Sequence, residues 1–257
     1  MKLGLIGKGI VGSAVFQGFA ELGHSISFTD PAYPETSFND ILDTDCVFIC
    51  VPTDPLPNGD CDTSIIEQVI SQLNNASYKG LVTIKSSIVP GTTVRLSNEY
   101  PSLRICVVPE FLRAKFAYQD FTTNHDLLII GSTRAEDYAI IREAYGYYPR
   151  QVVETNPTEA EVVKYFNNVN HAVQIIFANI AFDICKKLGA DYNVVYNSII
   201  KRDCFNSAYL DCNENLRGFG GHCLPKDTSA WNNLVKNLGL NYTMIQAAID
   251  DNKNLPK

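Results

Sequence analysis

The fold is decided by a stretch at the N-terminus, Lys2-Leu3-Gly4-Leu5-Ile6-Gly7-Lys8-Gly9-Ile10-Val11-Gly12. Its first residues have the apolar character of a buried strand, and the G-x-G-x-x-G that follows opens a helical pattern. Glycines at these positions let the backbone turn tightly and approach a pyrophosphate held at the helix N-terminus. The stretch therefore predicts a Rossmann-like unit that binds a dinucleotide.

An acidic residue indicates which dinucleotide is bound. Asp30 closes the second predicted strand, 18 residues after Gly12, where a carboxylate accepts hydrogen bonds from the adenine ribose and repels the extra phosphate of NADP. NAD is therefore the predicted cofactor. Val51-Pro52-Thr53, at the end of the third strand, would face the same crevice. A strand that ends at a proline and has no role in cofactor binding would have the same sequence. The predicted cofactor-binding residues are Gly7, Gly9, Ile10, Val11, Gly12, Asp30, Val51, Pro52 and Thr53.

Short apolar runs alternate with segments of helical period through the first half of the chain. Because the runs are short and uniformly apolar, they predict strands covered on both faces by helices, as in a doubly wound parallel α/β sheet. The runs lie at 2–6, 25–29, 46–51, 81–84, 105–108 and 127–130.

The second half has the pattern of an all-helical unit. Asn156-Pro157-Thr158-Glu159 reads as an N-cap with a reciprocal glutamate, so a long helix is expected to begin there and to stop near Gly189. Shorter helices are expected at 191–200, 226–238 and 241–253. We therefore predict two domains, 1–155 and 156–257, joined rigidly by the long helix.

Composition narrows the range of partners. The chain has 257 residues, a formal charge of -7 and a pI near 5.1, so it offers no broad basic surface for nucleic acid or an acidic membrane. No apolar run approaches the length of about 18 residues that a membrane span needs, and the first residues read directly into a strand rather than a signal peptide. The cysteines lie scattered, without zinc-like spacing, so no metal site and a reduced, cytoplasmic location are expected. They occupy positions 46, 50, 61, 106, 185, 204, 212 and 223.

One stretch combines residues that structure alone rarely requires. Gly218-Phe219-Gly220-Gly221-His222-Cys223-Leu224-Pro225-Lys226-Asp227 contains three glycines, a cysteine, a lysine and an aspartate. Glycines let a substrate approach the backbone, and a thiol near a cation can reach its thiolate form. The following aspartate can position the lysine or accept a proton.

This stretch resembles the GFGG-x-C-x-x-KD signature of the UDP-glucose/GDP-mannose dehydrogenase family. Further similar segments follow in family order: Gly7 to Gly12, Val51 to Thr53, 86–92, 109–113, and Lys164-Tyr165 with Asn168. The resemblance implies an NAD-dependent nucleotide-sugar 6-dehydrogenase of polysaccharide biosynthesis. Such an enzyme oxidises the C6 alcohol of a sugar such as that of UDP-glucose to a carboxylate in two hydride transfers. The intermediates are a thiohemiacetal and a thioester on the cysteine.

Roles carried over by the resemblance fall on seven positions. Cys223 would attack the aldehyde, and Lys164 and Asp227 would handle the alcohol proton through water. Asn168 would help to hold oxyanions, with Lys226 beside the same site. Ser87 would stand next to that water and the cofactor, and Glu110 would serve thioester hydrolysis. Independently of the resemblance, Lys164 and Asn168 are spaced i, i+4, which places them on one helix face.

The chain also departs from the family. Members carry a third domain that contributes to the nucleotide-binding cleft, whereas this sequence stops at Lys257. Either a separate chain supplies that part, or the nucleotide is held differently, or activity is lost. Ala114 and Lys115 replace a glutamate and a glycine, and the loop from Asp203 to Arg217 does not align with the sugar-binding arginine. The identity of the sugar therefore stays open. A homodimer through the long helix is expected, because its apolar positions exceed what one small unit can cover.

Two other interpretations remain open. A β-hydroxyacid or 6-phosphogluconate-type dehydrogenase also pairs a Rossmann-like unit with a helical unit bearing a Lys-x-x-x-Asn face, but it needs no thiol. A catalytically silent NAD-binding protein would fit the missing third domain. Cys223 discriminates between these readings, because a Cys223→Ser variant would retain turnover only in a single-hydride enzyme.

Overall fold

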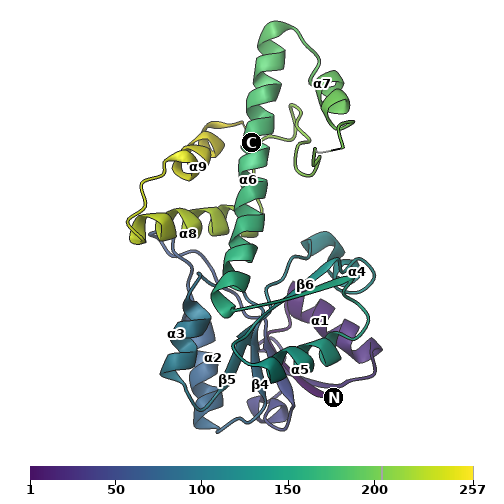
Figure 1. Cartoon of the computed structure of the whole chain (residues 1–257), viewed down its shortest axis with the longest axis vertical. Coiled ribbons are helices and arrows are strands. Elements are labelled where there is room, and N and C mark those ends of the chain that lie inside the picture. The colour runs from purple at the N-terminus through teal and green to yellow at the C-terminus, as the bar shows by residue number, and fades with distance from the viewer. Residues whose placement is uncertain (204, 257) are drawn as a thin grey trace. The chain divides into compact units, whose positions relative to one another are not determined.

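The computed structural model describes residues 1–203 and 205–256, so Cys204 and Lys257 lie outside the described residues (Figure 1). The chain divides into two compact units. We call residues 1–54 and 62–164 the sheet unit, and residues 55–61 together with those from Tyr165 onward the helical unit. The seven-residue segment 55–61 thus leaves the sheet unit and returns to it.

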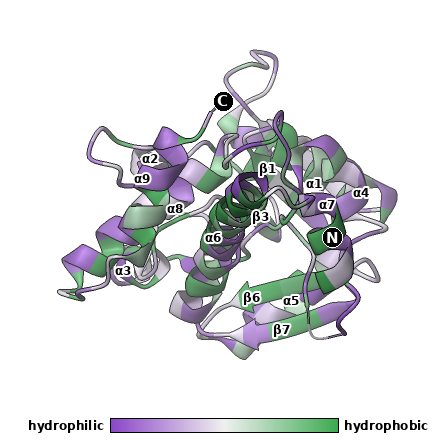
Figure 2. Ribbon diagram, turned by 90° about the horizontal axis from the view of Figure 1, so that it is seen from above, coloured by the Kyte–Doolittle hydropathy of each residue, from purple (hydrophilic) through white to green (hydrophobic). Residues whose placement is uncertain are grey.

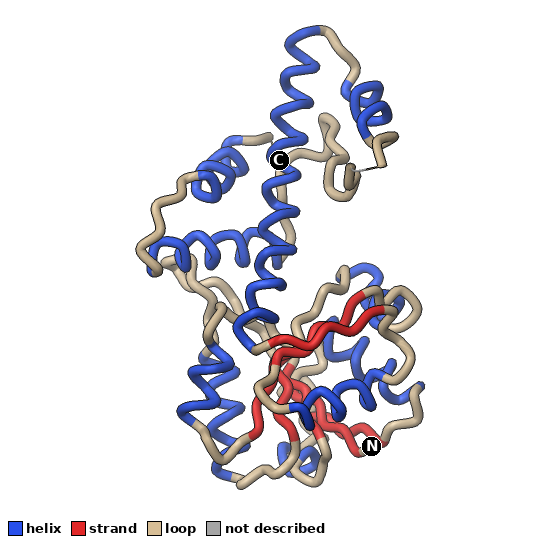
Figure 3. The backbone as a smooth tube through the Cα atoms, viewed as in Figure 1, coloured by secondary structure: helices blue, strands red, loops and turns tan. Residues whose placement is uncertain are grey.

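The sheet unit contains one seven-stranded sheet, drawn in red in Figure 3. Its order is β2-β1-β3-β4-β5-β6-β7. The strands are β1 (Lys2–Ile6), β2 (Ser25–Thr29), β3 (Cys46–Ile49), β4 (Leu81–Ile84), β5 (Arg104–Val107), β6 (Leu127–Gly131) and β7 (Gln151–Thr155). The α/β fold predicted from the alternating pattern is confirmed.

The sheet is mostly parallel, and the predicted parallel arrangement does not extend across one pair of strands near its edge. β5 and β6 pair antiparallel at Val107 and Gly131, and β7 then pairs parallel to β6, so the last two strands run against the other five. A parallel connection needs a crossover, usually a helix, that carries the chain back along the sheet. Between β5 and β6 the chain forms only the short helices η2 (Ala114–Phe116) and α4 (Ala117–Phe121). The chain therefore re-enters the sheet in the opposite direction.

The seventh strand was not predicted because it is a half-exposed edge strand. Its sequence, Gln-Val-Val-Glu-Thr, is mixed, whereas β6 is Leu-Leu-Ile-Ile-Gly and is drawn green for hydrophobic residues in Figure 2. A uniformly apolar run indicates a strand covered on both faces, so a strand at the sheet edge escapes that criterion.

Helices cover both faces of the sheet, as in a doubly wound fold. One core lies under α2 (Ser64–Asn75) and α3 (Thr92–Glu99), and includes Ile6, Val47 and Ile49 from the strands. The other lies under α1 (Ile10–Glu21), α4 and α5 (Ala135–Tyr145), and includes Leu5 and Phe48. A further short helix, η1 (Phe38–Ile41), follows β2.

The long helix α6 (Pro157–Leu188) begins in the sheet unit and continues into the helical unit. The predicted capping box is present: the Asn156 side chain accepts from the Glu159 N–H at 2.9 Å, and the Glu159 carboxylate accepts from the Asn156 N–H at 3.0 Å. After the helix, Gly189 adopts a φ of +70°, a conformation that glycine tolerates at helix ends.

Three further helices form the helical unit with α6, namely α7 (Tyr192–Ile199), α8 (Cys223–Asn237) and α9 (Met244–Asn254). The prediction placed the start of α8 at 226, three residues too late. Pro225 lies in the first helical turn, where its missing N–H has no intrahelical partner to lose. Cys223 is consequently the first residue of a helix rather than a loop residue. Among the described residues, no helix has the length and apolar character needed to cross a membrane.

Candidate active site

The glycines after β1 divide into those closed by packing and one that faces open space. A Cβ on Gly7, whose φ is +89°, would lie 2.6 Å from the Cys50 carbonyl oxygen, and a Cβ on Gly12 would lie 2.0 Å from the Gly7 carbonyl oxygen. Gly9, the N-cap of α1, would meet no atom within 4 Å. The closed glycines make the tight turn, and the open one leaves room at the helix N-terminus for a pyrophosphate.

Asp30 has its carboxylate fixed at the end of β2. One oxygen accepts from the Lys8 N–H at 2.6 Å and the other from the Ala32 N–H at 2.8 Å. The Lys8 ammonium lies over the rings of Phe28 and Phe16, at 3.7 and 4.1 Å from their centroids. The glycine turn and the acidic residue are therefore tied together by backbone hydrogen bonds, an arrangement that fits the adenosine half of NAD.

The ends of β3 and β4 are joined beside this turn. The Ser86 hydroxyl donates to the Val51 carbonyl at 2.7 Å, which fixes the start of the Val51-Pro52-Thr53 segment. Thr53 is buried, and Ser87 is half-buried. Because β1, β3 and β4 are adjacent and parallel, their carboxyl ends share the edge at which this fold binds ligands.

A buried lysine that was not predicted from the sequence lies between two strand ends. Lys85, directly after β4, has a side chain only 1% exposed, and its ammonium lies 2.7 Å from the Glu110 carboxylate after β5. It also donates to the Tyr145 hydroxyl at 2.6 Å. The available signal was a lysine at the end of an otherwise apolar run. The structure therefore gives Glu110 a cationic partner.

The ion pair determines the charges of both groups. Burial alone would raise the pKa of Glu110, but the neighbouring Lys85 ammonium holds that pKa below its usual value. Burial alone would lower the pKa of Lys85, and the Glu110 carboxylate raises it instead. Glu110 is therefore ionised at neutral pH and is matched by a buried cation.

Lys164 is held by the same residue through the main chain. Its ammonium donates to the Glu110 carbonyl oxygen at 2.5 Å and lies over the Phe111 ring, 5.4 Å from the centroid. Glu110 thus contacts two lysines, Lys85 by its carboxylate and Lys164 by its carbonyl. The structure brings together these two sites predicted from the sequence, Glu110 and Lys164.

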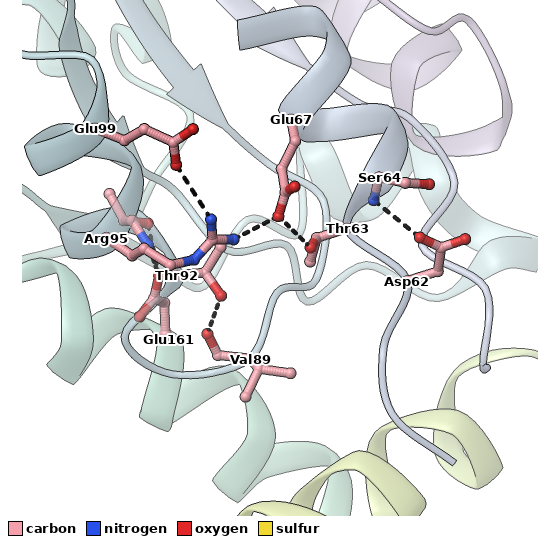
Figure 4. Close-up of polar contacts among 10 residues, drawn as sticks. Asp62, Thr63, Ser64, Glu67, Val89, Thr92, Arg95, Glu99 and Glu161 are labelled. Atoms are coloured by element: carbon pink, nitrogen blue, oxygen red, sulfur yellow. Dashed lines mark hydrogen bonds and ion pairs between the residues drawn. The ribbon is translucent and has the colours of Figure 1, made fainter. Parts of the chain in front are cut away.

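The start of α6 is fixed by Glu161, one helical turn before Lys164. Its buried carboxylate accepts from the N–H groups of Gly91 and Thr93, at 2.6 and 2.8 Å, and from the Thr93 hydroxyl at 2.6 Å. Burial raises the pKa of Glu161, and these donors oppose that shift. Figure 4 shows the Glu161 side chain close to Thr92, whose hydroxyl donates a hydrogen bond to the Val89 carbonyl. This carboxylate joins α6 to the loop that carries Ser87.

In the helical unit, three predicted residues form one buried network. The Asn168 amide donates to one oxygen of Asp227 at 2.6 Å, and the Lys226 ammonium donates to the other at 2.6 Å. Asp227 is fully buried, and both partners are also buried. Cys223, one turn before Asp227 on α8, is exposed and takes no part in this network. The thiol therefore lies at an accessible helix start, where backbone N–H groups favour an anion.

No group of three or more histidine, cysteine, aspartate or glutamate side chains suited to a metal ion occurs among the described residues.

Together, these features define a class of protein. A dinucleotide fingerprint on a doubly wound sheet, followed by a helical unit with an exposed cysteine at a helix start, is the architecture of a two-unit dehydrogenase. The UDP-glucose/GDP-mannose dehydrogenase family matches with its NAD binding domain at residues 33–148 and with its central domain at residues 158–254. The chain belongs to this family, and NAD is its cofactor.

Individual relatives agree with the family match. UDP-glucose 6-dehydrogenase AglM of Haloferax volcanii is 31% identical over 309 aligned residues, which cover all of this chain and 70% of the relative. A UDP-glucose dehydrogenase structure from the archaeon Pyrobaculum islandicum has a TM-score of 0.89 at 28% identity, over 98% of this chain and 68% of that one. Other curated relatives are matched over only about half of their length.

A dehydrogenase structure of low sequence identity shares the fold. The 3-hydroxyisobutyrate dehydrogenase of Mycobacterium tuberculosis has a TM-score of 0.78 at 16% identity, over 97% of this chain and 91% of that one. At this identity the likeness shows the fold alone. The choice between one and two hydride transfers therefore depends on the residues of the site.

Proposed function

We propose that this chain carries the cofactor-binding and cysteine-bearing parts of a nucleotide-sugar 6-dehydrogenase, with Cys223 as the nucleophile. The observation that carries the proposal is the arrangement at the start of α8. There an exposed cysteine precedes, by one turn, a buried aspartate held by Asn168 and Lys226. A single-hydride dehydrogenase has no use for the thiol, whereas an alcohol-to-acid oxidation must hold an aldehyde between its two steps.

The first oxidation converts the C6 alcohol to an aldehyde. NAD, when bound, accepts one hydride in each oxidation step. Lys164 and Asp227 are assigned to take up the alcohol proton through water, and Ser87 is assigned to bind that water. Asn168 has two amide hydrogens, of which one bonds to Asp227, so the other is available to an oxyanion.

The second oxidation takes place on the enzyme-bound aldehyde. The Cys223 thiolate adds to the carbonyl carbon, forming a C–S bond, and the oxygen takes up a proton to give the thiohemiacetal. Loss of a hydride from that carbon, with return of the proton, leaves a thioester. Water then attacks the thioester carbonyl and the C–S bond breaks, releasing the carboxylate and the Cys223 thiolate, while the two protons of that water pass to solvent.

Glu110 is assigned to the hydrolysis step. Because Lys85 keeps its carboxylate ionised, Glu110 can accept a hydrogen bond from the attacking water and orient it. This role differs from that of a neutral acid, which the pair with Lys85 disfavours.

Cys223 supplies the decisive test. The purified chain should form NADH with one member of a panel of UDP- and GDP-sugars, at two NADH per carboxylate. Cys223→Ala should abolish acid formation, and Cys223→Ser should slow it greatly, because a serine ester is a poorer leaving arrangement than a thioester. NAD binding serves as the control and should survive in both variants.

The alternatives give opposite results in the same assay. Full turnover by Cys223→Ser with one NADH per product would establish the single-hydride class. Tight NAD binding without NADH formation from any sugar, even after addition of a chain that carries the family's third domain, would identify a silent NAD-binding protein.

We also propose a homodimer through α6, with residues 1–155 as the NAD-binding part and 156–257 as the dimerisation and cysteine-bearing part. Support comes from a stripe of exposed apolar side chains spaced three or four residues apart on α6, namely Phe177, Ile180, Ile184 and Leu188. Such a stripe is typical of a helix–helix interface. Ile180→Glu should yield a monomer by light scattering at micromolar concentration, and an already monomeric wild type would refute the proposal.

The reaction is assigned to the cytoplasm on the basis of the thiols. The cysteines lie scattered along the sequence without paired spacing, which fits a reducing compartment. Quantitative fractionation of cells that produce the full chain would test this assignment.

A further inference from the structure

The loop that leads to Cys223 is fixed by two asparagine side chains from other helices. Asn252, on α9, accepts from the Phe219 N–H at 2.7 Å and donates to the Phe219 carbonyl at 3.0 Å. Asn179, on α6, accepts from the Gly218 N–H at 3.2 Å and from the Arg217 guanidinium at 2.6 Å. Three successive residues of the loop are thus held by side chains distant in sequence.

Packing closes the same part of the loop. Phe219 is buried in a small core with Ala172, Ile176 and Ala248. A Cβ on Gly218, whose φ is +63°, would lie 2.4 Å from the Asn252 side-chain oxygen. A glycine is therefore required at 218 by the asparagine itself.

The next part of the loop is open. A Cβ on Gly220 or Gly221 would meet no atom within 4 Å, and the exposed Cys223 follows at the start of α8. Packing against this chain does not require either glycine to lack a side chain. The space beside them is therefore available to a ligand that approaches the thiol.

We propose that Asn252 is a positioning residue: by bonding both main-chain groups of Phe219, it sets the path of Gly220 to Cys223 and so the direction of the thiol. This inference rests on the proposed function of Cys223. The hydrogen bonds of Asn252 hold the loop four residues before the nucleophile, and a Cβ on either glycine that follows Phe219 would meet no atom within 4 Å. Helix α9 is then part of the active-site scaffold.

The side-chain chemistry explains why an asparagine is suited to this position. An amide offers one acceptor and two donors in one plane, so it can satisfy a peptide N–H and C=O together. Leucine has a similar size but would leave both buried main-chain groups without partners. Aspartate would keep the acceptor for the Phe219 N–H and lose the donor.

The test compares the reactivity of Cys223 in the folded chain. Iodoacetamide labelling would be followed by mass spectrometry on the peptide that contains Cys223, in wild type, Asn252→Asp and Asn252→Leu. If the two hydrogen bonds between Asn252 and Phe219 are lost, we expect the first turn of α8 to fray. The Cys223 thiolate then loses the favourable interaction with the helix N-terminus. We expect labelling to be about two- to fivefold slower in Asn252→Leu, the size of that contribution, with Asn252→Asp intermediate.

The matched control is Asn232→Leu. Asn232 is a second buried asparagine of this unit, and its amide donates to Gln246 at 2.9 Å, joining α8 to α9 without touching the loop. It should label at the wild-type rate. Equal rates in all variants would overturn the proposal. Equal slowing in Asn232→Leu and Asn252→Leu would also overturn it, since general loosening of α8 against α9 would then explain both.

Turnover gives the second measurement. With an active sugar substrate, Asn252→Leu should lower kcat and leave the KM for NAD unchanged, whereas Asn232→Leu should change neither. If Asn252→Leu does not fold, the decision passes to Asn252→Asp, which preserves size and one bond. If the wild type forms no NADH even with a chain that carries the family's third domain, the proposed function fails, but the labelling rates still decide whether Asn252 directs the thiol.

Discussion

The two glycine-rich turns of this chain use their glycines alike but are held in place differently. In the cofactor turn, Gly12 is closed by the Gly7 carbonyl oxygen, five residues away in the turn itself, whereas Gly7 is closed by the main chain of Cys50, directly after β3. In the cysteine loop, the closing atom for Gly218 belongs to a side chain 34 residues away, on Asn252. Gly12 is therefore specified locally, and Gly218 depends on a distant side chain.

The same difference separates the ion pairs. Lys226 and Asp227 are neighbours in sequence, while Lys85 and Glu110 meet only because β4 and β5 are adjacent in the sheet. Local features can be altered one residue at a time. A long-range feature joins two distant segments, so the effect of replacing one partner should depend on whether the other partner is present. This contrast can be tested.

The largest effect is expected at the long-range ion pair. Lys85→Met leaves a buried carboxylate without its cation and should lower the free energy of unfolding by about 3–5 kcal/mol at pH 7. In the wild type, the pKa of Glu110 is lower in the folded than in the unfolded state, and this difference stabilises the fold. The contribution is present above the pKa of a glutamate in the unfolded chain, about 4.3, and is lost as the pH falls through the folded-state pKa. In the variant that pKa rises, so its stability declines as pH increases.

Urea unfolding at several pH values measures this difference. The gap between wild type and Lys85→Met should be widest at neutral pH and should narrow as the pH approaches about 4. The double variant Lys85→Met/Glu110→Gln is the control, and it should recover part of the loss. A gap independent of pH would show that Lys85 contributes through packing alone.

A smaller effect is expected in the locally held turn. Gly12→Ala places a methyl group against the Gly7 carbonyl and should cost about 1–3 kcal/mol of stability, the range for overpacking. It should also abolish detectable NAD binding by calorimetry. Gly9→Ala is the matched variant, because its methyl group meets nothing. It should change stability by less than about 0.5 kcal/mol and still weaken NAD binding, and a stability loss equal to that of Gly12→Ala would remove the distinction.

The smallest effect is expected as a coupling in the cysteine loop. Gly218→Ala should destabilise by about 1–3 kcal/mol, through the clash with Asn252 and through the strained positive φ. In an Asn252→Ala background the clash is absent, so the added cost should fall by about 0.5–1 kcal/mol in a double-mutant cycle. Additive costs would mean that the loop does not respond to Asn252.

Local features are the ones that the sequence predicted well. The capping box at Asn156 depends on residues close in sequence, and the glycine turn with Asp30 follows a spacing that can be counted in the sequence; both are present. The approximate bounds of α6, α7 and α9 were also predicted, because hydrophobic period and cap residues are local signals. The Asn168–Asp227 hydrogen bond joins two residues that the sequence analysis assigned to the site.

Long-range features escaped prediction for a physical reason. The reversed direction of β6 and β7 arises because the 19 residues between β5 and β6 form no long crossover helix. No local sequence pattern indicates this. Lys85 reads as an ordinary polar residue after a strand, and only the neighbouring strand reveals its partner. Asn252 reads as a surface residue of an amphipathic helix. Its function depends on a loop that passes beside it.

Residues 55–61 belong to the helical unit although the sheet unit surrounds them in sequence, and this affects any attempt to express the two units separately. The chain passes between the units at 54/55, 61/62 and 164/165, so no single cut yields both units intact. The segment is anchored in the helical unit, where the Asn233 amide donates to the Asn58 carbonyl at 2.8 Å and to Asp60 at 2.9 Å. A fragment ending near residue 155 would carry this segment without its anchor. A fragment beginning there would lack residues 55–61 altogether. Expressing either half independently would therefore require redesigning this segment as well as the long helix.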